Sequence, residues 1–160
     1  MMIKTKKQWL TKYVSDASRF VVILEKVLIE VHKMGQIDEQ MIKNGSYEYT
    51  KALDTLIFRF MKLQDLMGGK IFPLLLNILG NDAPNQTFID VLNKLEKLGY
   101  LESAHQWRNL RDARNDLSHE YAEDDKALAE RTNEIINYAN FLVSYWKVLK
   151  QKIELLDVYD

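Results

Sequence analysis

Three side chains suited to phosphate and proton chemistry lie within one short stretch, ARNDLSHEY, which runs from Ala113 to Tyr121. Arg114 keeps its charge at any ordinary pH, and its planar fork of donors fits phosphate oxygens. His119 is the residue of this stretch that exchanges a proton readily near neutral pH. Tyr121 adds a hydroxyl group. This combination predicts a site that holds a phosphate and moves protons.

The spacing of Arg114 and His119 sets a condition on the backbone. An ideal helix turns by about 100° per residue, so these positions would lie about 140° apart on one helix. They converge only if His119 lies at or beyond the end of the helix, and the polar run SHEYAEDD predicts such an end. In a structural alternative, His119 is held as a cation by the helix dipole. In that alternative, both arginines pair with nearby acids, namely Arg111 and Arg114 with Asp112, Asp116 or Glu120.

The elements that must position these residues are predicted to be helices. Between Leu10 and Val31, apolar residues recur at steps of three and four, which is the pattern of one buried helix face. Similar patterns predict helices at about 49–67, 88–95, 104–114 and 128–153.

The boundaries of these helices also carry signals. Residues 36–48 are expected to form a loop, and Gly68-Gly69 to break or kink the second helix before a short continuation at Pro73. Ser103 is a predicted N-cap, as is Asp124 or Asp125. Asp65 is expected either to form an ion pair on its own helix, near Arg59, or to orient an active-site group.

No alternating β-branched stretch, internal repeat or linker competes with the helical pattern. The sequence therefore predicts an all-α protein, an up-and-down bundle of four to five helices in a single domain over residues 1–160.

Composition excludes several functional classes. The chain has 160 residues and no cysteine, which excludes a disulfide framework and a thiolate metal site. Its net charge of −1 excludes an overall positive potential that would attract nucleic acid. The N-terminal lysines precede no apolar signal-peptide core, and the longest apolar run, IFPLLLNIL, is too short to span a bilayer. We therefore expect a cytoplasmic protein with no membrane partner.

Metal and cofactor motifs are absent from the sequence. The histidines, His32, His105 and His119, are scattered without the spacing of metal ligands. Gly68-Gly69 lacks the spacing of a phosphate-binding loop. The expected site needs neither a metal nor a cofactor.

The string Arg114-Asn115-x-x-x-His119-x-Tyr121 resembles the R-x-x-x-x-H-x-Y signature of the HEPN family, and in particular of its HepT-like toxins. The surrounding WRNLRDARNDLSHEY resembles the motif helix of that family, and the helical content, length and late motif position agree as well. The resemblance covers nearly the whole chain. It implies a HEPN-like helical bundle that forms a homodimer with two motifs facing one cleft, and a metal-independent endoribonuclease acting on RNA such as tRNA or mRNA.

The resemblance also implies roles for individual residues. Arg114 and His119 would be catalytic, the first stabilising the phosphorane and the second transferring protons. Asn115 and Tyr121 would support them by hydrogen bonding or stacking on the RNA. In HepT-like proteins a cognate nucleotidyltransferase-type antitoxin adenylylates the motif tyrosine, which makes Tyr121 the candidate for modification.

The sequence around the motif is acidic. Seven acidic residues and three arginines lie between Glu102 and Asp125, and this excess of negative charge makes a poor surface for a polyanion such as RNA. This acidic stretch is expected to dock an antitoxin, or to contact a folded RNA at few points. Two functions other than a nuclease also remain open. The chain could be a non-catalytic, substrate-binding partner of a minimal nucleotidyltransferase, or it could be a helical interaction module.

Overall fold

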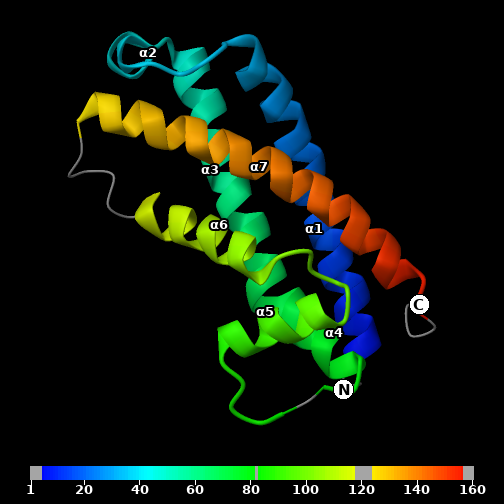
Figure 1. Cartoon of the computed structure of the whole chain (residues 1–160). Coiled ribbons are helices and arrows are strands. Elements are labelled where there is room, and N and C mark those ends of the chain that lie inside the picture. Colours follow the sequence, from blue (N-terminus) through cyan, green and yellow to red (C-terminus); the bar gives the residue numbers. More distant parts are fainter. Residues whose placement is uncertain (1–4, 82, 118–123, 157–160) are drawn as a thin grey trace.

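The computed structural model describes residues 5–81, 83–117 and 124–156, and all regular structure in these ranges is helical. This confirms the all-α prediction. The long helices α1 (Lys6–Lys33) and α3 (Tyr47–Leu66) run antiparallel, and α7 (Asp125–Glu154) packs against both (Figure 1). The shorter helices α5 (Phe88–Lys97) and α6 (Ala104–Asp116) pack against each other, and α6 also contacts α7.

α1 begins earlier than its apolar stripe because Thr5 caps it. The Thr5 side chain accepts a hydrogen bond from the Gln8 N–H (3.2 Å), and the Gln8 side chain accepts one from the Thr5 N–H (2.9 Å). The predicted stripe is buried along the whole helix, from Leu10 to Val31. The helix ends before Gly35, whose φ of +74° favours glycine.

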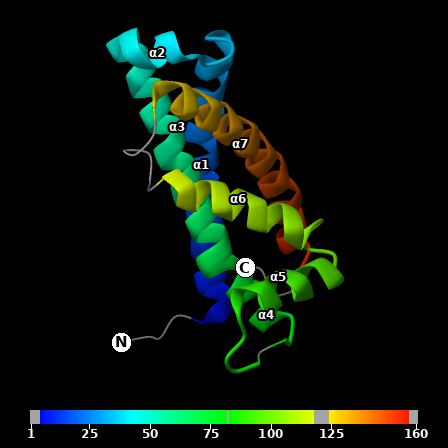
Figure 2. The ribbon, with the colours of Figure 1, turned by 60° about the vertical axis from the view of Figure 1, so that its left-hand side comes forward.

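The expected loop at 36–48 contains a short helix, so that prediction is wrong in part. α2 (Glu39–Asn44) is capped by Asp38, whose side chain accepts a hydrogen bond from the Met41 N–H. α2 buries no residue fully, and six residues are too few to produce a recognisable apolar period. α2 lies at one end of the molecule and α4 and α5 lie at the other (Figure 2).

Of the break or kink expected at Gly68-Gly69, the break does not occur, because the chain stays helical there, and the kink stays a prediction. α3 continues without interruption through a π-helical turn, η1 (Met67–Ile71), into α4 (Phe72–Ile78), where Pro73 occupies the first turn as predicted. The Phe72 N–H donates to the Met67 carbonyl, the wider spacing of a π-helix. Such turns occur frequently at functional sites.

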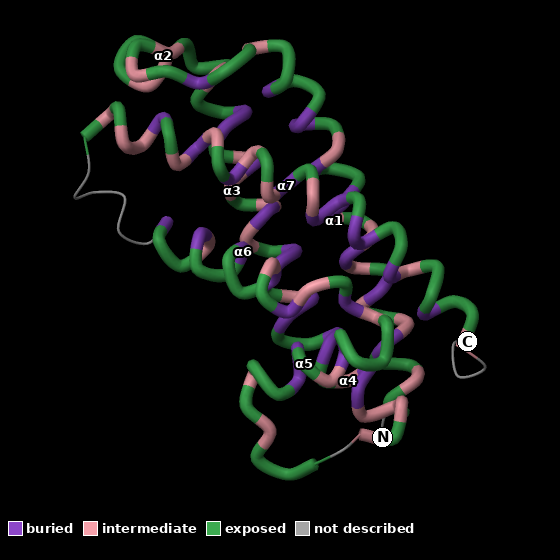
Figure 3. The backbone as a smooth tube through the Cα atoms, viewed as in Figure 1, coloured by how far each residue is buried: buried purple, intermediate pink, exposed green. Residues whose placement is uncertain are grey.

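Large aromatic side chains join α4, α6 and α7 at the centre of the core. The rings of Phe72 and Trp107 lie 4.6 Å apart between centroids, and the Tyr145 ring lies 6.0 Å from Trp107. Buried positions follow the inward faces of the long helices (Figure 3). This packing fixes α6, and with it the first half of the motif, against the bundle.

Within the described ranges, none of the helices combines the length and apolar character that crossing a membrane requires.

Candidate functional site

α6 carries Arg114 and Asn115 in its last turn. The helix is capped by Ser103, whose side chain accepts a hydrogen bond from the Gln106 N–H (3.1 Å), and it buries Trp107, Leu110 and Ala113. It ends at Asp116, before His119 in the sequence. His119 and Tyr121 lie outside the described residues, so the convergence of His119 with Arg114 and the supporting role of Tyr121 stay predictions.

Arg114 forms an ion pair with Asp65, and this pair crosses from α6 to α3. Arg114 Nε donates to Asp65 Oδ1 and Nη2 donates to Oδ2, both at 3.0 Å. This bidentate hydrogen bonding raises the pKa of Arg114 above its ordinary value.

Among the described residues, the partners expected for these charges are therefore wrong, whereas Glu120, the third acid expected to pair with the arginines, lies outside the described residues. Arg114 does not pair with Asp112 or Asp116, and Asp65 does not pair along its own helix with Arg59. Residues two apart on a helix point in different directions, so the acids at 112 and 116 do not face Arg114. Arg59 lies over the ring of Phe58 instead, with its guanidinium carbon 5.5 Å from the ring centroid.

A cavity of about 400 Å³ lies beside this ion pair, and we call it the arginine cavity. Gly68-Gly69 of η1 contribute to its wall, and the side chains that line it are those of Gln64, Asp65, Phe88, Arg111, Arg114 and Asn115. The volume lies in the range of about 300–1,000 Å³ that is usual for small-molecule sites.

Arg111 is the second cation of the arginine cavity, and sequence reasoning did not assign it a functional role. Its guanidinium carbon lies 4.0 Å from the centroid of the Phe88 ring, and it forms no ion pair within the described part of the chain. With Arg114 balanced by Asp65, Arg111 leaves the cavity with one net positive charge. The spacing from Arg111 to Arg114 is three residues, which places both on one helix face and could have indicated this.

Gln64 is the buried polar residue of the cavity, only 3% exposed. Its Oε1 has no hydrogen-bond partner among the described residues, and such atoms are rare because leaving one unpaired costs about 1–3 kcal/mol. A donor group on a ligand would satisfy it. The signal in the sequence is a polar residue that extends the apolar stripe of Leu56, Phe60 and Leu63.

The arginine cavity can therefore bind an anion. Arg114 uses Nε and Nη2 for Asp65, which leaves Nη1 without an acceptor within the described ranges. Asp65 holds the guanidinium plane, and Arg111 supplies the uncompensated charge. In the ranges 5–81, 83–117 and 124–156, no group of three or more His, Asp or Glu side chains could hold a metal ion.

Comparisons with protein-family models, with curated proteins and with solved structures give no match for this chain.

Proposed function

We propose that this chain is a metal-independent endoribonuclease of the HEPN type, which acts in the cytoplasm as the toxin of a toxin–antitoxin pair. The observation that carries the proposal is the arginine cavity. It brings Arg111 and Arg114, on the helix that precedes His119, next to the buried, unpaired amide oxygen of Gln64 on α3. The R-x-x-x-x-H-x-Y resemblance supports the same chemistry.

The proposed reaction needs no nucleophile from the protein. The ribose 2′-hydroxyl attacks the adjacent phosphorus, the bond to the 5′-oxygen breaks, and a cyclic phosphate and a 5′-hydroxyl result. One His119 takes the proton of the 2′-hydroxyl and a second His119 gives a proton to the leaving oxygen. Arg114 and Arg111 stabilise the negative charge that develops on the phosphorane oxygens. Asn115, which lines the cavity, adds a hydrogen bond to the phosphate.

The need for two proton-transfer groups is the reason for proposing a homodimer. One chain carries a single His119, whereas a two-fold axis through a shared cleft supplies a second copy on the opposite wall. Full activity of a monomer, measured at dilutions where sedimentation shows no dimer, would contradict this part of the proposal.

Tyr121 is the proposed point of control. Its hydroxyl would accept an adenylyl group from the cognate antitoxin, which blocks the cleft and adds a negative charge where RNA must bind. Intact-mass measurement after co-expression with a candidate antitoxin tests this, because the added mass should be absent from a Tyr121→Phe variant.

The decisive experiment is RNA cleavage by the purified protein in EDTA. We expect the wild type to leave cyclic-phosphate ends, and His119→Ala to lose about 10²–10⁴ in rate. Arg114→Ala should lose a similar factor. Arg108→Ala is the matched control, since Arg108 is exposed on the same helix and does not line the cavity. Cleavage that needs a metal, or that survives His119→Ala, would refute the proposal. Growth arrest on induction, abolished by His119→Ala, tests the toxin role.

A second function is favoured by the Arg114–Asp65 pair itself. Since this pair also holds α6 to α3, the arginine has a structural role that needs no RNA. In that case the chain is a non-catalytic partner of a nucleotidyltransferase. It would then stimulate that enzyme without cleaving RNA, and Asp65→Ala and Arg114→Ala would be equally harmful.

A further inference from the structure

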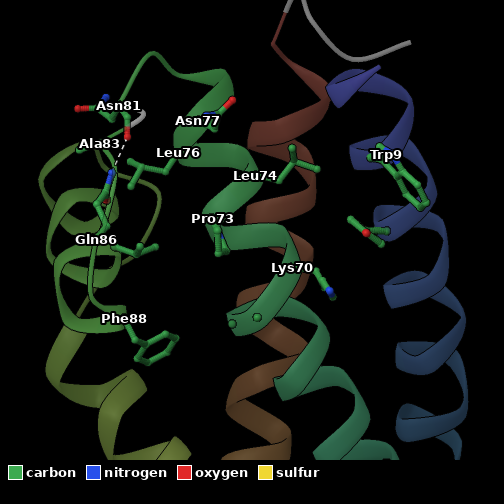
Figure 4. Close-up of a pocket in the computed structure, with 14 residues that line it drawn as sticks. Trp9, Lys70, Pro73, Leu74, Leu76, Asn77, Asn81, Ala83, Gln86 and Phe88 are labelled. Atoms are coloured by element: carbon green, nitrogen blue, oxygen red, sulfur yellow. Dashed lines mark hydrogen bonds between the residues drawn. The ribbon is translucent and has the colours of Figure 1, made fainter. Parts of the chain in front are cut away.

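A second cavity adjoins the arginine cavity and shares Gly68, Gly69 and Phe88 with it. It has a volume of about 660 Å³, and we call it the amide groove. It extends over η1 and α4, with Gln86 and Phe88 on one side and Trp9 of α1 on the other (Figure 4). Because the two cavities share part of their wall, a chain-like ligand can occupy both at once.

Gly69 is the first indication that this groove binds something. Glycine within a helix costs about 1 kcal/mol relative to alanine, so its presence calls for a reason. Gly69 has no positive φ, and a Cβ built on it would meet no atom within 4 Å. Neither backbone strain nor packing therefore requires glycine at this position. Gly68 differs, because its Cβ would lie 3.4 Å from both Phe88 and Trp107. Because Gly69 lines both cavities, a side chain at 69 would instead project into open space beside them.

Gln86 provides a hydrogen-bond acceptor of fixed orientation. Its Nε2 donates to the Asn81 carbonyl (2.9 Å), so its Oε1 must point the other way. That oxygen is buried and has no partner among the described residues, and the same holds for Oδ1 of Asn77. Both residues line the groove. An acceptor held in this way selects a ligand that presents an N–H donor.

Aromatic and cationic groups complete the groove. Trp9 stacks on Tyr13 with ring centroids 5.5 Å apart, and both rings line one side. Lys70 lies on the exposed floor between this pair and Gln86 (Figure 4). Proteins that bind single-stranded nucleic acid commonly use aromatic side chains to stack on the bases and cations to contact the phosphate backbone, and this groove has both.

We propose that the amide groove binds the nucleotides of single-stranded RNA that flank the phosphate in the arginine cavity, and that Gln86 selects the base beside it. The proposal rests on the proposed function and deepens it. Adenine, cytosine and guanine present an exocyclic amino group, whereas uracil has only its ring N3–H, flanked by two carbonyl oxygens that would face Gln86 Oε1 as second acceptors. The groove therefore favours a base with an exocyclic amino group over uracil, and adenine and cytosine serve as the test.

Binding can be separated from cleavage with 2′-O-methyl oligonucleotides, which lack the attacking hydroxyl. Trp9 is 38% exposed, whereas Trp107 and Trp146 are at most 1% exposed, so quenching of tryptophan fluorescence reports on this groove. We expect saturable quenching by five-nucleotide oligomers of A and of C, with about tenfold weaker binding of U. Quenching should disappear in Trp9→Phe, whose affinity is followed by anisotropy of labelled oligomers.

Two variants test the assignment independently. Gly69→Leu fills the shared space and should weaken all three oligomers at least tenfold. Gln86→Leu should weaken the A and C oligomers by about three- to tenfold and leave U unchanged, the effect of one lost hydrogen bond. Gln40→Leu is the matched control, because Gln40 is exposed on α2 at the far end of the molecule.

The outcomes separate this inference from the proposed function. Binding that is sensitive to Gly69→Leu and Gln86→Leu in a protein that cleaves no RNA supports the groove and refutes the nuclease. If the wild type cleaves RNA but oligomer binding is unchanged in both variants, the role of the amide groove in RNA binding is refuted and the proposed nuclease function is not affected. Should Gly69→Leu fail to fold, loss of the preference over U in Gln86→Leu still decides the matter.

Discussion

Arg114 of α6 and Asp65 of α3 meet side by side, with two hydrogen bonds of 3.0 Å joining the guanidinium to the carboxylate. The Asp65 side chain is 50% exposed and that of Arg114 is 25% exposed, so water screens the pair. Pairs of this kind contribute about 0–1 kcal/mol to stability. Its larger effect is geometric, because it fixes the plane of the arginine at the cavity.

The Asp65→Asn variant should separate two effects of Asp65, namely its charge, which opposes RNA binding, and its hydrogen bonds, which position the Arg114 guanidinium. Removal of the carboxylate charge raises the net charge of the cavity, so KM for RNA should fall a few-fold at low salt. The kcat should fall about tenfold, because the guanidinium loses one fixed partner. Steady-state kinetics measure both values, and Asp65→Glu should restore kcat in part. A variant that changes neither value would show that the pair is only structural.

Arg111→Ala should weaken RNA binding about tenfold and lower the slope of log affinity against log salt by about 0.7, the contribution of one phosphate contact on a single strand. Arg111 is the charge of the arginine cavity that no carboxylate within the described ranges balances. Titration of a labelled 2′-O-methyl oligomer at several salt concentrations provides both numbers. Arg108→Ala serves as control, and an equal loss in both variants would contradict a specific role for Arg111.

Gly69→Ala should stabilise the fold by about 0.4–1 kcal/mol and raise Tm by about 1–4 °C. The new methyl group enters open space on a helical backbone and removes conformational freedom from the unfolded chain. Thermal and urea unfolding measure the gain. The same substitution should weaken oligomer binding slightly, because Gly69 lines both cavities. A destabilised Gly69→Ala would show that the π-helical turn itself requires glycine.

Tyr145 should make stability fall at alkaline pH. Burial raises the pKa of this phenol well above its ordinary value of 10.0, and its hydroxyl donates to the Tyr100 carbonyl at 2.7 Å. The folded pKa lies above the unfolded one, so this contribution is complete below about pH 10 and declines as pH rises further.

Tyr145→Phe should therefore lower the free energy of unfolding by about 0.5–1.5 kcal/mol at pH 7 and flatten its decline above pH 10. Urea unfolding between pH 7 and 11 measures both effects. Tyr47→Phe is the control, since the Tyr47 side chain is 77% exposed. An unchanged alkaline slope in Tyr145→Phe would assign the decline to other groups.

Local signals in the sequence determined most of the fold. The three- and four-residue steps of the apolar stripe predicted α1, α3 and α7, because burial of one helix face is the dominant favourable term. The caps at Ser103 and Asp124 fall where predicted, since a side-chain oxygen satisfies the free N–H groups of the first turn whatever lies around it. α2 was not predicted, because six residues are too few to show a recognisable apolar period.

The sequence by itself also placed Arg114, Asn115, His119 and Tyr121 within eight residues of one another, and the resemblance of this string to the HEPN signature makes their joint role a prediction. Only the tertiary structure decided which groups surround Arg114. Asp65, Gln64 and Gly69 come from α3 and η1, and Phe88 comes from α5. Their approach to α6 depends on helix packing, which no local period encodes. The continuity of α3 through Gly68-Gly69 was likewise a tertiary outcome, because burial of Met67, Ile71 and Phe72 outweighs the helix-breaking tendency of two glycines.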